Sequence, residues 1–153
     1  MKKLLTFVLL SLTLVASATF AKDLINNKDG VAIKGYDPVS YFKDGPEKGS
    51  KEFSAEHEGV TYYFVSEENQ KTFEQAPEKY APAYGGWCAY AMIDGEKVSI
   101  NPKSYKIVNG KLLLFYDKFF TDTLKLWNKK DEPETDLIST ADQKWEKIVT
   151  NDK

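Results

Sequence analysis

The chemistry that this sequence suggests centres on Cys88, the only cysteine among its 153 residues. Gly85 and Gly86 lie just before it, and glycine permits backbone conformations and close approaches that other residues forbid. Met92 follows four residues later, so on a helical turn the thiol and the thioether would share one face. Soft sulfur ligands of this kind suit Cu(I). The spacing therefore predicts a metal site at Cys88 and Met92, with a copper ion as the cofactor that these ligands favour.

Packing is a second interpretation of the same segment. A lone cysteine is most often a small buried hydrophobe, and stable metal sites usually need three or four ligands. His57, the only histidine, lies far from Cys88 in the sequence and would join it only if the fold brought the two together. Two readings stay open: a metal-handling protein, or a module that binds a non-metal ligand or an exported partner and keeps Cys88 as a buried structural residue.

Aromatic and acidic residues supply further candidates for a ligand site. Three aromatic residues surround the cysteine: Tyr84, Trp87 and Tyr90. Such rings could line a pocket for a small apolar or cationic ligand, with ordinary core packing as the alternative. Asp37 is a further ligand-binding candidate, although an aspartate before a proline is above all a turn signal.

The sequence does not predict an enzyme. A nucleophilic cysteine needs a base or an electropositive setting, and neither histidine nor arginine lies near Cys88 in the sequence. The chain also lacks a phosphate-binding glycine loop, a paired-carboxylate motif and a metalloprotease helix. A thiol redox role ranks last because no second cysteine is present to resolve a disulfide.

The charge pattern argues against nucleic acid as a partner. All 21 basic residues are lysine, against 23 acidic residues, and the formal net charge is −2. Arginine is the usual residue for bidentate recognition of phosphates and base edges, and this chain has none. By the same argument, the net charge makes an anionic membrane surface an unattractive partner.

The N-terminus has the three regions of a secretory signal peptide. Lys2 and Lys3 precede an apolar run that ends near Val15, and small residues follow. We expect cleavage after Ala21, with Ala18 as the alternative site, and an exported protein that is periplasmic or secreted. A retained N-terminal anchor is the competing reading. No second apolar run approaches spanning length, so we expect no membrane insertion of the mature chain.

Local patterns predict one α+β domain over residues 22–153, with short helices packed on a small antiparallel sheet. We expect its core at about 30–128 and a C-terminal helix at about 139–150. No internal repeat is evident. The predicted strands cover 31–33, 39–42 and 60–65, and Asn109-Gly110 predicts a two-residue hairpin within 105–116. Helices are predicted at 67–75 after the N-cap Ser66, at 77–80, along the face of Phe120, Leu124 and Trp127, and at about 140–149 with Ala141, Trp145 and Ile148 buried.

Several segments together resemble the YHS domain family in its exported, single-domain form. The matching segments are 35–42 (Gly-Tyr-Asp-Pro-Val-Ser-Tyr-Phe), 59–66, Asn69 and Phe73, 77–82, 84–91, 105–112, and the helices of Trp127 and Trp145. The resemblance covers nearly all of the mature chain in order. It implies a YHS-like fold and, since members occur in heavy-metal transport ATPases and oxygenase components, a link to metal handling.

The metal site of those relatives does not carry over to this chain. Metal-linked members tend to carry a Phe-Cys-Ser-x-x-Cys pattern, and this chain has Phe-Val-Ser-Glu-Glu-Asn at 64–69. Both cysteines of the pattern are absent. Cys88, in a segment that belongs to the exported subgroup, is the remaining soft ligand that the resemblance points to.

Overall fold

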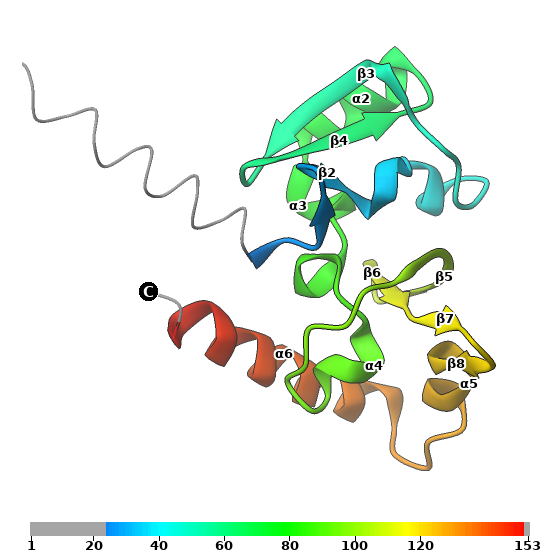
Figure 1. Ribbon diagram of the computed structural model, residues 1–153, viewed down its shortest axis with the longest axis vertical. Coiled ribbons are helices and arrows are strands. Elements are labelled where there is room, and N and C mark those ends of the chain that lie inside the picture. The colour runs from blue at the N-terminus through cyan, green and yellow to red at the C-terminus, as the bar shows by residue number, and fades with distance from the viewer. Residues whose placement is uncertain (1–23, 152–153) are drawn as a thin grey trace, which may run out of the picture.

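A computed structural model describes residues 24–151, and the predicted signal peptide at 1–21 lies outside them. The described chain is an α+β structure, with one β-hairpin in its upper part and another in its lower part (Figure 1). In chain order the elements are β1 (Asn27–Lys28), β2 (Val31–Ala32), the 3₁₀ turns η1 (Ile33–Gly35) and η2 (Ser40–Phe42), β3 (Ser50–His57), β4 (Val60–Phe64), α2 (Glu67–Gln75), α3 (Pro77–Tyr80), η3 (Ala83–Gly86), α4 (Ala89–Met92), β5 (Asn101–Val108), β6 (Lys111–Phe115), β7 (Asp117–Lys118), β8 (Thr121–Asp122), α5 (Thr123–Asn128) and α6 (Glu134–Asn151).

The upper hairpin belongs to a four-stranded sheet with the order β1-β2-β4-β3. Strand β2 runs parallel to β4, and the other two pairs are antiparallel. Alternate residues of β4 are buried, namely Val60, Tyr62 and Phe64, because one face of the strand covers the core. Helix α2 packs against this hairpin and begins where the Ser66 side chain accepts a hydrogen bond from Asn69 N–H.

The second half of the fold repeats the first with a constant offset of 51 residues. The turn η1 contains left-handed Ile33 (φ 50°), and η3 contains left-handed Tyr84 (φ 57°) at the equivalent position. Each turn leads into a short helix and then into a hairpin with an eight-residue strand and a five-residue strand. The two halves therefore share one supersecondary unit.

Backbone hydrogen bonds follow the same offset. Asp37 N–H donates to Glu47 O at 2.9 Å, and Cys88 N–H donates to Val98 O at 2.9 Å. Each hairpin has its register shift at the equivalent place, between Ser50 and Ser54 and between Asn101 and Tyr105. Both hairpins also close through two residues with positive φ, Glu58-Gly59 and Asn109-Gly110. The repeat thus lies in the backbone geometry, and the expectation of no repeat was wrong.

Few side chains are shared between the halves, which is why the sequence hides the repeat. Over the repeated segment the identical pairs include Gly35 with Gly86 and Phe64 with Phe115. The glycines share a left-handed φ of about 80°, and the two phenylalanines are both buried. Backbone conformation and burial were kept, and those properties leave many residue choices open.

One element breaks the repeat. In the first half the N-cap Ser66 follows β4 after one residue, whereas in the second half the N-cap is Asp122 rather than residue 117. The extra residues form the small β7–β8 hairpin, in which Asp117 pairs with Asp122 and Lys118 with Thr121. This hairpin is an insertion relative to the first half.

Strand β6 joins the two hydrophobic clusters of the molecule. Leu112 and Leu114 pack into the cluster around β2 and β4, while Leu113 and Phe115 pack into the cluster beneath α6. All four side chains are buried because the strand is covered on both faces. The two halves therefore share a core through this strand.

Several predicted elements agree with the structure. Helices α2 and α3 have the predicted bounds, Ser66 caps α2, and Phe73 is buried beneath it. The Asn109-Gly110 hairpin is present, with φ of 50° and 78° at the two turn residues, as a type I′ turn requires.

Other predicted elements were wrong in identified ways. The segment 39–42 is not a strand, because Asp37 Oδ1 accepts from Val39 N–H and Ser40 N–H and bends the chain into η2. Phe120 is not a buried helical residue, because α5 starts only after the N-cap Asp122. The last helix begins at Glu134 rather than near 140, because Pro133 stands before its first turn, where proline is tolerated. Strand β3 was not anticipated.

Candidate functional site

Cys88 lies in the core and has hydrogen-bonding partners there. Its side chain is fully buried, and Tyr116 N–H donates to Sγ at 3.4 Å. The Thr123 hydroxyl lies 3.4 Å from the same sulfur and donates to Tyr116 O. The sulfur therefore holds the end of β6 next to the first residue of α5.

Met92 is also fully buried, but it packs in a different cluster from Cys88. The two residues bracket α4, and Met92 N–H donates to Cys88 O at 3.0 Å. In the described part of the chain, no three side chains of His, Cys, Asp or Glu come together in a group that could hold a metal ion. The donor set around Cys88 therefore does not fit a closed metal site, which needs three or four converging ligands.

Asp37 is buried and has four hydrogen-bond donors around its carboxylate. Oδ1 accepts from Val39 N–H and Ser40 N–H, while Oδ2 accepts from Val65 N–H at 2.9 Å and Asn69 Nδ2 at 2.7 Å. A carboxylate with this many donors is satisfied within the protein. Asp37 thereby connects η2, the end of β4 and α2.

Trp87 and Tyr90 do not line the cleft between the first hairpin and α6. Trp87 Nε1 donates to Leu24 O at 2.8 Å, and Lys97 Nζ lies 5.9 Å from its ring centroid. Lys130 Nζ lies 5.7 Å from the ring centroid of Tyr90. Each ring thus already faces a cation from the same chain.

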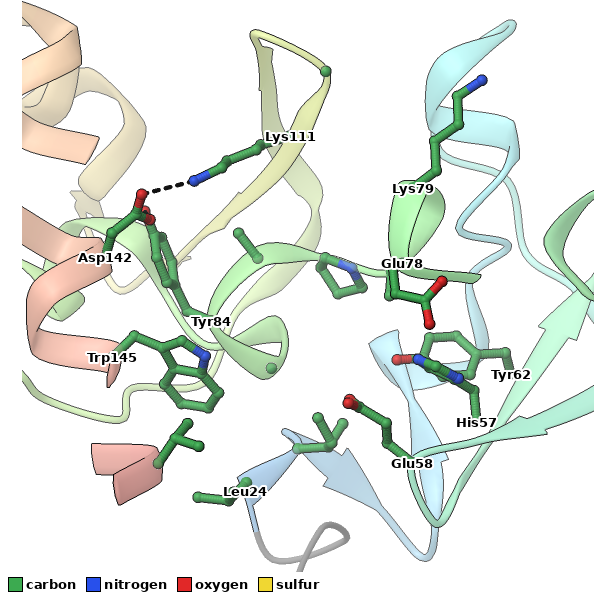
Figure 2. A pocket seen from close by; sticks show the side chains of 17 residues that line it. Leu24, His57, Glu58, Tyr62, Glu78, Lys79, Tyr84, Lys111, Asp142 and Trp145 are labelled. Atoms are coloured by element: carbon green, nitrogen blue, oxygen red, sulfur yellow. Dashed lines mark hydrogen bonds and ion pairs between the residues drawn. The ribbon is translucent and has the colours of Figure 1, made fainter. Parts of the chain in front are cut away.

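Tyr84 lines that cleft, which has a volume of about 480 Å³. Figure 2 shows its two ends: Tyr84, Lys111, Asp142 and Trp145 lie at one, and Tyr62, His57, Glu58 and Glu78 at the other. Apolar side chains also line the cleft, among them Leu24, Ile25, Ala81, Pro82 and Val149. The cleft lies between the first hairpin and α6, and residues from η3 line it between them.

The Tyr84 end of the cleft is a connected polar group. Tyr84 Oη donates to Asp142 Oδ1 at 3.0 Å, and Lys111 Nζ lies 2.7 Å from Asp142 Oδ2. Burial, together with the neighbouring Asp142 carboxylate, raises the pKa of Tyr84 above that of a free phenol. The phenol therefore stays protonated at neutral pH and acts as a donor.

The opposite end of the cleft has unpaired acidic groups. Within residues 24–151, the carboxylates of Glu58 and Glu78 form neither an ion pair nor a hydrogen bond. His57 lies near both glutamates (Figure 2), and its ring packs edge-to-face on Phe73 with the centroids 5.9 Å apart. Burial and then the Glu58 charge raise the pKa of Tyr62. This end therefore carries two carboxylates against one ammonium, that of Lys79, whose Nζ lies 5.1 Å from the Tyr80 ring centroid.

Gly85 determines how closely the walls of the cleft approach. Its φ of 58° is left-handed, and a Cβ at this position would lie 2.8 Å from Leu24 O and 3.0 Å from the Trp145 ring. Asn26 N–H donates to Gly85 O at 2.8 Å, which ties the N-terminal segment to η3. Sequence reasoning found Tyr84 and the glycines but not Glu58, Glu78 or Trp145, which only the fold brings to one place.

Part of this chain matches a known protein family. The model of the YHS domain matches residues 39–84, from η2 to the first residues of η3. Residues 39–84 are the part of this chain that is recognised as YHS. Asp37 lies just before the match and Cys88 just after it. No curated protein and no solved structure matches the chain. The match to the YHS domain covers mainly the first repeat and ends at Tyr84, one of the residues that line the cleft.

Proposed function

We propose that this YHS-domain protein binds a small organic cation with an apolar part in the cleft between the first hairpin and α6. The carboxylates of Glu58 and Glu78 carry the proposal, because neither has a counterion among the described residues, while Lys79, which also lines the cleft, has its Nζ over the Tyr80 ring. The third cleft carboxylate, Asp142, is already paired with Lys111. An ammonium group would form ion pairs with the two free carboxylates. The desolvation cost would be modest because the cleft is open to solvent.

The apolar lining sets the second requirement for the ligand. Trp145 and Leu24 form a hydrophobic wall away from the free carboxylates (Figure 2), and Val149 also lines the cleft. A flat ring or short alkyl chain would bury its surface there, at about 25 cal/mol per Å². The Tyr84 hydroxyl and Lys111, held by Asp142, form a polar edge beside that wall. The ligand class is therefore an arylalkylamine or a similar amphiphilic amine.

Calorimetric titration with 2-phenylethylamine tests this proposal, and 3-phenylpropionate serves as the matched acid. We expect heat of binding for the amine alone, lost in Glu58→Gln/Glu78→Gln and weakened in Trp145→Ala. Glu56→Gln is the control, since Glu56 is exposed near the end of β3, two residues before Glu58, but does not line the cleft. Equal binding of amine and acid, or binding unaffected by the double substitution, would reject the proposal.

Metal handling by Cys88 is the second candidate. The link of the YHS family to metal handling and the nearby thioether of Met92 support it. Since both sulfurs are buried, copper would reach Cys88 only if α4 moved away from β6. Cu(I) titration followed by native mass spectrometry separates the candidates: uptake of one copper that Cys88→Ser abolishes would favour metal handling over ligand binding.

Export is part of the proposed function. The residue pattern at 1–21 supports a cleaved signal peptide, and the domain would then begin at Lys22. An intact mass that matches residues 22–153 in the secreted or periplasmic fraction is the expected result. A full-length form in the membrane fraction would contradict it. Within residues 24–151, no helix has the length and apolar character to cross a bilayer.

A further inference from the structure

The tip of the β7–β8 hairpin exposes two adjacent phenylalanines. Phe119 is 85% exposed, and Phe120 is as exposed as a free side chain. Both residues have left-handed φ, 50° and 68°, a conformation that asparagine and glycine adopt readily and phenylalanine does not. A tight turn at this place would therefore be more stable with other residues. The two rings also bury little surface in the described chain, so packing does not offset this strain.

The β7–β8 hairpin also has no equivalent in the first half of the fold. The first half passes from β4 to the cap of α2 without it, whereas the second half inserts it before α5. A strained, apolar insertion without a packing role indicates a function outside the fold.

One lysine lies at the base of the tip, and two more line a cavity next to the strand that holds β7. Lys118 precedes Phe119 in β7, and Lys28 and Lys34 line a cavity of about 240 Å³ next to β5. Asn101, at the start of β5, donates to Asp117 Oδ2 and so holds β7 beside this cavity. Burial, and then the charges of Lys118 and Lys28, lower the pKa of Lys34.

The three lysines keep their charge available. Among the described residues none of them forms an ion pair with a carboxylate, while Lys34 Nζ donates to Ile100 O. The acidic residues of the hairpin have partners: Asp117 accepts from Asn101, and Asp122 pairs with Lys125 at 3.2 Å. The surface thus combines an apolar point with ammonium groups that have no counterion.

We propose that the Phe119-Phe120 tip docks this protein on an anionic lipid bilayer, with the two rings in the interfacial region and the three lysines near lipid phosphates. Aromatic rings favour the membrane interface, and each nearby lysine adds attraction to anionic headgroups. The net acidic charge of the chain made such a surface an unattractive partner, but docking depends on the local arrangement of charge. Two rings at a turn reach only the interface and do not span the bilayer.

Cosedimentation of the purified mature protein with lipid vesicles tests the proposal. We expect binding to phosphatidylcholine vesicles that contain phosphatidylglycerol and little binding to phosphatidylcholine alone. The decisive variant is Phe119→Asn/Phe120→Gly, which places the preferred type I′ residues in the turn. It should melt at a higher temperature than the wild type and lose vesicle binding. Because the variant would be more stable than the wild type, unfolding could not explain its loss of vesicle binding.

The lysine contribution has its own control. Lys28→Gln/Lys118→Gln should weaken vesicle binding by about fivefold per lysine at low salt, and added salt should reduce the difference. Lys51→Gln/Lys147→Gln removes the same charge from other exposed sites and should have a smaller effect. If the wild type fails to bind anionic vesicles, or if the Asn-Gly turn variant binds as well as the wild type, the proposal is wrong and the tip is left as a contact for a protein partner.

Discussion

Cys88 occupies the position in the second half of the fold that Asp37 occupies in the first. Asp37 Oδ2 accepts from Val65 N–H, just after β4, and Cys88 Sγ accepts from Tyr116 N–H, just after β6. Each residue also contacts a polar side chain at the start of the following helix, Asn69 for Asp37 and Thr123 for Cys88. This equivalence gives Cys88 a structural role: its sulfur is the acceptor that holds the end of the β5–β6 hairpin.

The first prediction concerns the Cys88 thiol. Since the side chain is fully buried, an alkylating reagent should modify it only after unfolding. Cys88→Ser should lower the free energy of unfolding by about 1–3 kcal/mol, because a hydroxyl replaces the larger sulfur in a closely packed site. Mass spectrometry after iodoacetamide treatment with and without denaturant measures the first effect, and urea unfolding measures the second. Rapid alkylation of the native protein would contradict this account.

The equivalent substitution in the first half should be more damaging. Asp37→Ala leaves the partly buried Val65 N–H and the buried Asn69 amide without their acceptor. Hydrogen bonds to charged groups are worth about 1.5–3 kcal/mol each, so we expect a loss of about 3 kcal/mol or more. Asp37→Asn should also destabilise, since its NH₂ group would face a donor. If Asp37 served only to bind a ligand, neither change would alter the urea midpoint.

The turn at Gly110 allows backbone strain to be measured without a packing effect. A Cβ at Gly110 would meet no atom within 4 Å, so its φ of 78° is the main constraint there. Gly110→Val should destabilise by about 1 kcal/mol or more, whereas Gly110→Asn should cost less because asparagine tolerates the left-handed region. Thermal melting of the pair checks this, and equal melting temperatures would be inconsistent with the turn.

Gly85 and Gly86 should differ in their tolerance of a side chain. Gly85→Ala would place Cβ within 2.8 Å of Leu24 O, while the nearest atom to a Cβ at Gly86 is Pro82 Cγ at 3.3 Å. Both positions have left-handed φ, which alone costs about 1 kcal/mol. We therefore expect Gly85→Ala to be the more destabilising by urea unfolding, and to weaken amine binding in the cleft as well. The reverse order would show that the approach of Leu24 can relax.

Glu134 should make stability depend on pH. Burial opposes its ionisation, but hydrogen bonds from Lys106 and Trp127 outweigh burial and lower its pKa below 4.5. A carboxyl with a depressed pKa in the folded state stabilises the protein fully above the unfolded pKa, and this contribution disappears as pH falls through the folded value. The loss of stability between neutral pH and pH values below 4.5 should thus be smaller in Glu134→Gln. Parallel pH profiles for the two proteins would exclude this role.

Local chemistry was enough to predict some of the elements. The Ser66 cap and the Asn109-Gly110 turn depend on residues that are neighbours in the chain, and the structure confirms both. The same local reasoning was wrong at 39–42, where apolar residues favour a strand. There the carboxylate of Asp37 holds the backbone in a turn, and its hold depends on Val65 and Asn69, far away in sequence.

The sequence by itself therefore determined caps, turns and the residues able to bury apolar surface, because those properties act over a few residues. Tertiary structure alone decided the repeat, which is carried by φ angles and hydrogen bonds rather than by identical side chains. It also separated Cys88 from Met92 into two clusters and brought Glu58 and Trp145 to one cleft. The physical reason is that converging side chains depend on how hairpins and helices pack over β6, and spacing along the chain does not encode that packing.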